Sequence, residues 1–372
     1  MTETGLLLFP WDLEREGIDP VMRFAADSGI RTLYLASSYH AGRFLHPHGP
    51  QPLVYTPEDG VVYFHPRHER YGLMKPRVAA MARDVDWLEA LGSRVDRYGL
   101  RLAAWAVCLH NTRLGRLHPD AVVRNAFDDP YWYALCPSHP AVQHYLELLI
   151  ADHARYPLAA IIIEAFRYMD AVHGEHHERW SVPLPNLERA LLGLSFAPTD
   201  LLEASHSGID GPRVRQIVRE HLTLFFSAYP ELPTGMPLSV QEFEDRQPEL
   251  RAYRECLVKI LDSLLARVAA GVKQTDIELI GQGLQEFNIT CAPNHPSLDV
   301  LILSGLPASG RPPGKKVYEV LRLGFGEIAS PGQMRDKVGS AARQNVDGIL
   351  FYNYGETPAT VLRWLGPVLR GV

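Results

Sequence analysis

Short runs of apolar residues recur along the chain and alternate with stretches of helical spacing. Eight runs are apolar at nearly every position, the first over residues 5–9 (GLLLF) and the fourth over residues 158–164 (LAAIIIE). Strands that are apolar on both faces are typical of a parallel sheet covered by helices. The other six predicted strands cover residues 31–37, 101–109, 276–282, 298–304, 317–323 and 346–352.

Eight such strands alternating with helices predict an α/β fold, a single (β/α)8 TIM barrel that takes residues 1–372 as one domain. An open doubly wound sheet usually has a glycine-rich phosphate turn after its first strand, and Pro10, Trp11 and Asp12 occupy that position here. Apolar residues at helical spacing predict helices over residues 20–28, 78–95 and 141–154, and a long amphipathic helix from Leu250 to Val268.

Two connections are longer than barrel loops usually are. They cover residues 38–75 and 166–273 and follow the second and fourth predicted strands. Because the loops at the carboxyl ends of barrel strands carry the active site, we expect both insertions to lie over the catalytic face.

Composition narrows the class of protein. The 372 residues are 46% apolar and 22% charged with a net charge of −6, which is typical of a globular protein. No basic run indicates nucleic-acid binding, and no apolar stretch approaches the ~20 residues that span a bilayer. Residues 5–9 lack the flanks of a signal peptide, and the four cysteines lack CxxC spacing, so we expect a cytoplasmic protein with reduced thiols. The oligomeric state is left open.

The chemistry of a barrel is expected where its strands end. Glu164 directly follows three isoleucines at the end of the fourth predicted strand. The alternative for such a glutamate is a solvated loop carboxylate or a salt bridge to a helix. Because barrel strand ends point into the site, where a desolvated carboxyl group can serve as an acid, we favour a catalytic role for Glu164.

The ends of the first, second and eighth strands add aromatic and polar side chains. Trp11 and Asp12 suit a sugar ring, whose apolar face stacks on an indole while its hydroxyl groups bind the acid. The alternative is that Asp12 caps the following helix. Tyr39 and His40 follow the second strand, and Tyr352 ends the eighth, where packing of the barrel end is an equal alternative.

The third predicted strand runs into a loop rich in hydrogen-bond donors. His110, Asn111 and Arg113 come first, and His118 follows five residues later. These side chains suit the recognition of hydroxyl or carboxylate groups.

A histidine cluster lies beyond Glu164. On a helix, His173 and His177 would share one face, which is metal-ligand spacing, and His176 lies beside them. Substrate contact and a purely structural role are alternatives that we favour over a metal. We therefore expect no cofactor and count His177 among the substrate contacts.

These residues carry a resemblance to known proteins. Residues 98–169, with the motifs GLRLAAWAV, HNTRLGRLHPD, LCPSHPAVQHY and IIIEAFRY, resemble the hypothetical glycosyl-hydrolase-like groups of TIM-barrel proteins. The SYH motif of residues 38–40 and the YNYGE motif after the last strand are also similar. A more distant similarity is to the sialidases of glycoside hydrolase family 156, in which an Asp after strand one and a His beyond strand three form the catalytic pair. Asp12 and either His110 or His118 match that pair.

The resemblance implies an enzyme that cleaves a glycosidic bond in a small carbohydrate or glycoconjugate. We expect Glu164 to act with Asp12, or alternatively with His110 or His118, in carboxylate-assisted acid/base catalysis. Alternatives are a metal-dependent sugar isomerase or hydrolase on the same fold, a non-catalytic carbohydrate-binding barrel, and an interaction protein. The expected substrate contacts are Trp11, Tyr39, His40, Asn111, Arg113, His177 and Tyr352.

Overall fold

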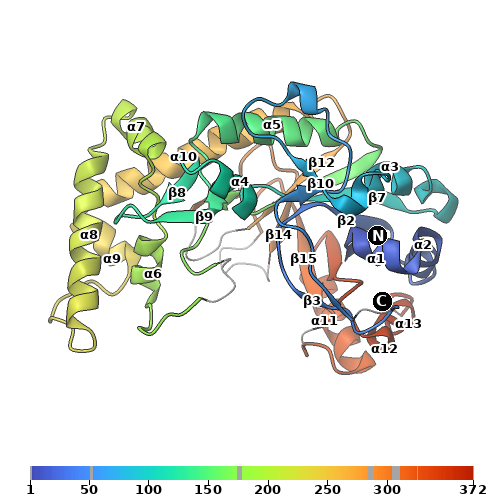
Figure 1. Cartoon of the computed structure of the whole chain (residues 1–372). Helices are drawn as coiled ribbons and strands as arrows, with labels where there is room; N and C mark the ends of the chain where they lie inside the picture. The colour runs from blue at the N-terminus through green and yellow to red at the C-terminus, as the bar shows by residue number, and fades with distance from the viewer. Residues whose placement is uncertain are drawn as a thin grey trace.

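Eight parallel strands form a closed barrel in the computed structural model, which describes residues 2–50, 53–173, 178–283, 289–303, 311–324 and 326–371 (Figure 1). Around the barrel the order is β1, β2, β7, β10, β12, β14, β15 and β16, and β16 pairs with β1 again. The predicted (β/α)8 barrel is therefore confirmed. The strands are β1 (Glu3–Leu8), β2 (Thr32–Tyr39), β7 (Arg101–Val107), β10 (Leu158–Glu164), β12 (Glu278–Gln282), β14 (Val300–Leu303), β15 (Lys316–Arg322) and β16 (Gly348–Tyr352).

Each strand begins and ends within two residues of its prediction, and Ser304, the predicted end of the sixth, lies outside the described residues. Short strands decorate the barrel. They are β3 (Phe44–Leu45), β4 (Val54–Tyr55), β5 (Val61–Val62), β6 (Arg77–Val78), β8 (Val122–Arg124), β9 (Pro130–Leu135), β11 (Arg167–Tyr168) and β13 (Ile289–Thr290).

Helices cover the outside of the barrel, and a group of them extends to one side (Figure 1). Of the described residues, no helix is long and apolar enough to cross a membrane. The helices are α1 (Pro10–Glu16), α2 (Ile18–Asp27), α3 (Trp87–Gly92), α4 (Thr112–Leu117), α5 (Pro140–His153), α6 (Asn186–Leu192), α7 (Pro198–His206), α8 (Gly211–Ala228), α9 (Val240–Arg246), α10 (Pro248–Ala270), α11 (Pro331–Arg343), α12 (Ala359–Leu362) and α13 (Leu365–Leu369), with 3-10 turns η1 (His68–Arg70), η2 (Ala80–Ala82) and η3 (Val95–Tyr98).

The helix predicted over residues 78–95 is wrong. Its first apolar residue belongs to β6, which pairs with β5. The helix proper, α3, begins only after Asp86, whose side chain accepts a hydrogen bond from the backbone N–H of Glu89. The apolar residues at helical spacing in this segment thus belong to several short elements rather than to one helix. The helices predicted around α2, α5 and α10 are present.

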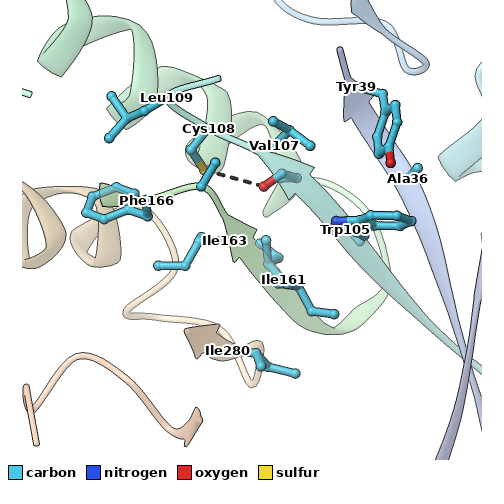
Figure 2. Close-up of a cluster of buried hydrophobic side chains, with 14 of the residues drawn as sticks. Ala36, Tyr39, Trp105, Val107, Cys108, Leu109, Ile161, Ile163, Phe166 and Ile280 are labelled. Atoms are coloured by element: carbon cyan, nitrogen blue, oxygen red, sulfur yellow. Dashed lines mark hydrogen bonds between the residues drawn. The ribbon is translucent and has the colours of Figure 1, made fainter. Parts of the chain in front are cut away.

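The interior of the barrel is packed with aromatic and branched side chains. Trp105 of β7 and Ile280 of β12 are both register partners of Ile162 of β10, so these three side chains share the inner face, while Ile161 and Ile163 lie on the outer face. Figure 2 shows Trp105, Ile280, Ile161 and Ile163 among the buried side chains. Nearer the amino ends of the strands, a Cβ added to Gly5 of β1 would lie 2.5 Å from the side chain of Tyr34 of β2. A glycine is required there because the tyrosine ring fills the space that a side chain would need.

Residues between β10 and β12 form a helical group. The helix α10 packs against α5 of the barrel layer and against α7, α8 and α9. Its apolar stripe from Leu250 to Val268 is buried, as the spacing predicted. In Figure 1, α10 runs from the barrel into this group, so one helix connects the two parts.

Candidate active site

Glu164 lies where the sequence predicted it, at the carboxyl end of β10. Its side chain is half-buried, and the indole N–H of Trp105 donates a hydrogen bond to its Oε2. Trp105 comes from the neighbouring strand β7, which pairs with β10 along its whole length. The sheet register therefore places an indole donor beside the carboxyl group.

Aromatic side chains form the floor beneath this carboxyl group. The ring of Tyr39 packs edge-on against Trp105 with centroids 5.1 Å apart, and Tyr352 lies 5.8 Å from Trp105. The hydroxyl groups of Tyr39 and Tyr352 are hydrogen-bonded to each other. Burial raises the pKa of both above the ordinary value for tyrosine, so both hydroxyl groups stay protonated and can donate.

A second carboxyl group, Glu356, follows β16 and was missed in the sequence. The amide of Asn353 donates to its Oε2 at 2.8 Å, and the hydroxyl of Tyr352 is hydrogen-bonded to it. Burial raises the pKa of Glu356. The YNYGE motif carried the signal, an acidic residue shortly after a strand end, but the prediction considered only its tyrosine and asparagine.

Three histidines gather at one side of the floor. The rings of His40 and His110 stack at 4.2 Å, and His173 lies 4.7 Å from His110. Burial lowers the pKa of His110 to about 2, and His40, His173 and Arg167 act in the same direction. Burial likewise lowers the pKa of His173 to about 4. Neutral rings of this kind are hydrogen-bonding groups, and a pKa near 2 makes His110 a weak base at neutral pH.

Arg167 faces the same space and was also missed. It lies on β11, directly after the turn that follows Glu164, and its Nη1 donates to Oε1 of Gln282 at 2.6 Å. Burial lowers its pKa, while the charge of Glu164 opposes that shift. The sequence signal was the motif EAFRY, in which the cation follows the acid by three residues.

Trp11 and Asp12 follow the carboxyl end of β1 but are buried, whereas we expected them to be open to a sugar. Trp11 is fully buried, stacks on Phe9 at 4.3 Å and donates through its indole N–H to Nε2 of His46 at 3.1 Å. Asp12 is 1% exposed. Residues of the insertion that follows β2 cover them, because Trp11 packs against Phe44 and Tyr55 and His46 contacts both side chains.

The carboxyl group of Asp12 is enclosed by protein. Its Oδ2 accepts a hydrogen bond from the backbone N–H of Phe9 at 2.8 Å, which is the capping contact of α1. His46 lies 3.5 Å from Oδ1, and a Cβ added to Gly355 would lie 2.0 Å from that same oxygen. Burial raises the pKa of Asp12 to about 7. The capping alternative describes what this side chain does here.

The residues predicted in the strand-three loop are separated. His110 reaches the floor, but Asn111 caps α4 by accepting from the N–H of Leu114 at 2.8 Å. His118 lies at the other end of this six-residue helix, and six residues of α-helix rise ~9 Å. Arg113 lies on α4, where burial and the charge of Arg77 lower its pKa.

The predicted contact His177, with His176, lies outside the described residues. Among the residues that the structure does describe, no three His, Cys, Asp or Glu side chains are placed to hold a metal ion.

No protein-family model matches the chain, and no curated protein sequence matches it. Solved structures do. The chain is similar to α-L-fucosidase isoenzyme 2 from Paenibacillus thiaminolyticus, with a TM-score of 0.58 at 12% identity over 100% of this chain and 49% of that one. It is also similar to the catalytic domain of β-amylase from Paenibacillus polymyxa (TM-score 0.54, 10% identity, 99% and 98% covered). A third is the PgaB (BpsB) glycoside hydrolase domain from Bordetella bronchiseptica (TM-score 0.54, 13% identity, 95% and 94% covered).

These neighbours are glycoside hydrolases, and the chain spans about half the length of the fucosidase. At 10–13% identity the likeness shows a shared fold. The chain therefore has the closed eight-stranded barrel of these glycoside hydrolases.

Proposed function

We propose that the protein is a glycoside hydrolase in which Glu164 is a catalytic carboxyl group. The observation that carries the proposal is the position of Glu164 at the carboxyl end of β10, held by the indole N–H of Trp105 above an aromatic floor. In barrels, side chains at these strand ends form the active site. The barrels that resemble this one include a fucosidase and a β-amylase, which supports a sugar as substrate.

The floor suits a carbohydrate. Aromatic faces stack on the apolar face of a sugar ring, and protonated tyrosine hydroxyl groups donate to its oxygens. Tyr352, Tyr39 and His40 remain our candidates for substrate contact. Asn111, engaged as a helix cap, and Trp11, fully buried, become structural residues in this proposal.

The proposed reaction needs a second group. Asp12 was the first candidate from the sequence, but its enclosed carboxyl group has no path to a sugar. His110, the second candidate, is neutral at working pH and would orient or donate rather than act as a base. His118 lies at the far end of α4 from His110, so the proposal gives His118 no role.

The experiment first tests the wild-type protein on a panel of aryl glycosides. The Glu164→Gln variant is then assayed on each glycoside that the wild type hydrolyses. We expect this isosteric change to keep the thermal midpoint and ligand binding but to lower kcat by several orders of magnitude, because a catalytic carboxyl group cannot be replaced by an amide. Glu220→Gln, at an exposed position on α8, is the matched control and should leave kcat unchanged. Near-normal turnover in Glu164→Gln would refute the role. Sugar binding without any turnover by the wild type would indicate a non-catalytic carbohydrate-binding barrel.

A further inference from the structure

Glu356 and Glu164 come from opposite walls of the barrel. In the closed order, β16 lies four strands from β10 in either direction. Strand-end side chains on such a pair of strands face each other across the mouth. Eight strands ~4.8 Å apart and tilted by ~36° form a barrel roughly 15 Å across.

That width sets the expected spacing of the two carboxyl groups. Glu164 ends β10, and its carboxyl carbon reaches up to ~4 Å inward from its Cα, while the carboxyl group of Glu356 is held at the hydroxyl of Tyr352, which ends β16. We therefore expect the two carboxyl groups to lie closer together than the width of the barrel. A spacing of about 6.5 to 9.5 Å leaves room for one water beside the sugar and is typical of inverting glycoside hydrolases.

The floor connects the two groups through short contacts. Glu164 accepts from the indole of Trp105, the ring of Trp105 lies 5.8 Å from that of Tyr352, and the hydroxyl of Tyr352 is hydrogen-bonded to Glu356. Tyr39 and Tyr352 each experience the charges of both glutamates. The two carboxyl groups therefore border one aromatic floor.

The orientation of Glu356 is fixed by its own loop. Asn353 donates to Oε2 at 2.8 Å through its side-chain amide, and its Oδ1 accepts the backbone N–H of Glu356 at 2.9 Å. Asn353 is itself fully buried, so this support is held by packing. Glu356 remains half-buried, unlike Asp12, which is 1% exposed.

We propose that Glu356 is the second catalytic carboxyl group of the site, acting as general acid across the mouth from Glu164. This inference rests on the proposed function. Glu356 gives its proton to the leaving oxygen as the C1–O bond breaks. Glu164 takes a proton from water, whose oxygen forms the new bond to C1, and exchange with solvent returns both groups to their starting states. Burial raises the pKa of Glu356, so it stays protonated to higher pH than an exposed glutamate, as a general acid must.

The test compares leaving groups in Glu356→Gln. A general acid matters when the leaving oxygen needs a proton, so alkyl glycosides should lose ~10²- to 10⁴-fold in kcat, while dinitrophenyl glycosides should lose less than about tenfold. The basic limb of the pH profile should also disappear. Glu164→Gln should lose activity on both substrates, and Glu220→Gln on neither. Nuclear magnetic resonance of the first product should show inverted configuration at C1.

The outcomes separate the two proposals. If Glu164→Gln is inactive but Glu356→Gln retains normal activity on alkyl glycosides, the inference is overturned and the proposed function stands. If the wild type hydrolyses no glycoside, the proposed function fails and the inference with it. Leaving-group dependence in Asp12→Asn instead of Glu356→Gln would also overturn the assignment, as would a product of retained configuration. Should Glu356→Gln not fold, Glu356→Asp, which withdraws the carboxyl group by one methylene, should show the same dependence at smaller size.

Discussion

The enclosed carboxyl group of Asp12 makes a quantitative prediction about stability. Asp12→Asn keeps the shape of the side chain and an oxygen that can accept from the N–H of Phe9, but it removes the titrating group. Burial raises the pKa of Asp12 from 3.8 to about 7, so the folded chain holds a proton that the unfolded chain releases. The contribution of Asp12 to wild-type stability should therefore fall as pH rises from about 4 through 7.

The size of the effect follows from that difference. Each pH unit between the unfolded and folded values is worth ~1.4 kcal/mol, so ionised Asp12 costs ~4 kcal/mol above pH 7. Between pH 5 and pH 8 the linkage amounts to ~3 kcal/mol. The neighbouring His46 stays neutral over this range, because burial lowers its pKa to about 4. The Asn variant should thus gain ~3 kcal/mol relative to the wild type across this window.

Urea unfolding of both proteins at half-unit steps from pH 5 to pH 8 measures this gain. Only the difference between the two curves matters, because the other titrating groups are common to both proteins. Asp27→Asn, at an exposed position on α2, is the control and should give a flat difference. The reasoning is refuted if the Asp12→Asn difference is flat, or if the variant becomes less stable relative to the wild type as pH rises.

Three further changes test the packing and the site. Gly355→Ala places a Cβ 2.0 Å from Oδ1 of Asp12 and should cost ~1–3 kcal/mol in urea unfolding; an unchanged midpoint would contradict the close approach. Trp105→Phe removes the indole donor to Glu164, a loss of ~1.5–3 kcal/mol that corresponds to roughly 10- to 100-fold in kcat, and full activity would deny its positioning role. Leu264→Ala on α10, at 0% exposure, should cost ~2–5 kcal/mol, and a loss below about 1 kcal/mol would mean that the helix is not anchored there.

The fold could be predicted because barrel strands carry their own signal. A strand such as β10 is apolar on both faces, since one side meets the barrel interior and the other meets helices. The helix over residues 78–95 failed because spacing alone cannot distinguish one helix from several short elements in the same register. What separated them was the pairing of β6 with β5 and the cap at Asp86, and the pairing depends on residues distant in sequence.

The candidate site could be predicted only in part. Glu164 was accessible to sequence reasoning because it ends a strand that the pattern defines. Asp12 also follows a strand, but His46, from the insertion after β2, lies against it and helps to bury it. Glu356 was not predicted, because it lies four residues past β16. Its position depends on the hydrogen bond from Asn353 and on the closure of the barrel, which the sequence pattern does not reveal.

That closure also constrains how the chain is made. Glu3 of β1 pairs with Gly348 of β16, so during synthesis β1 has one unpaired edge until β16, the last strand of the barrel, has been made. Until then β1 and β15 each present unpaired backbone groups, which can template association with other chains. Joining ends so far apart in sequence also makes closure a slow step. Loss of β16 would leave an open sheet in which β1 and β15 each keep an unpaired edge.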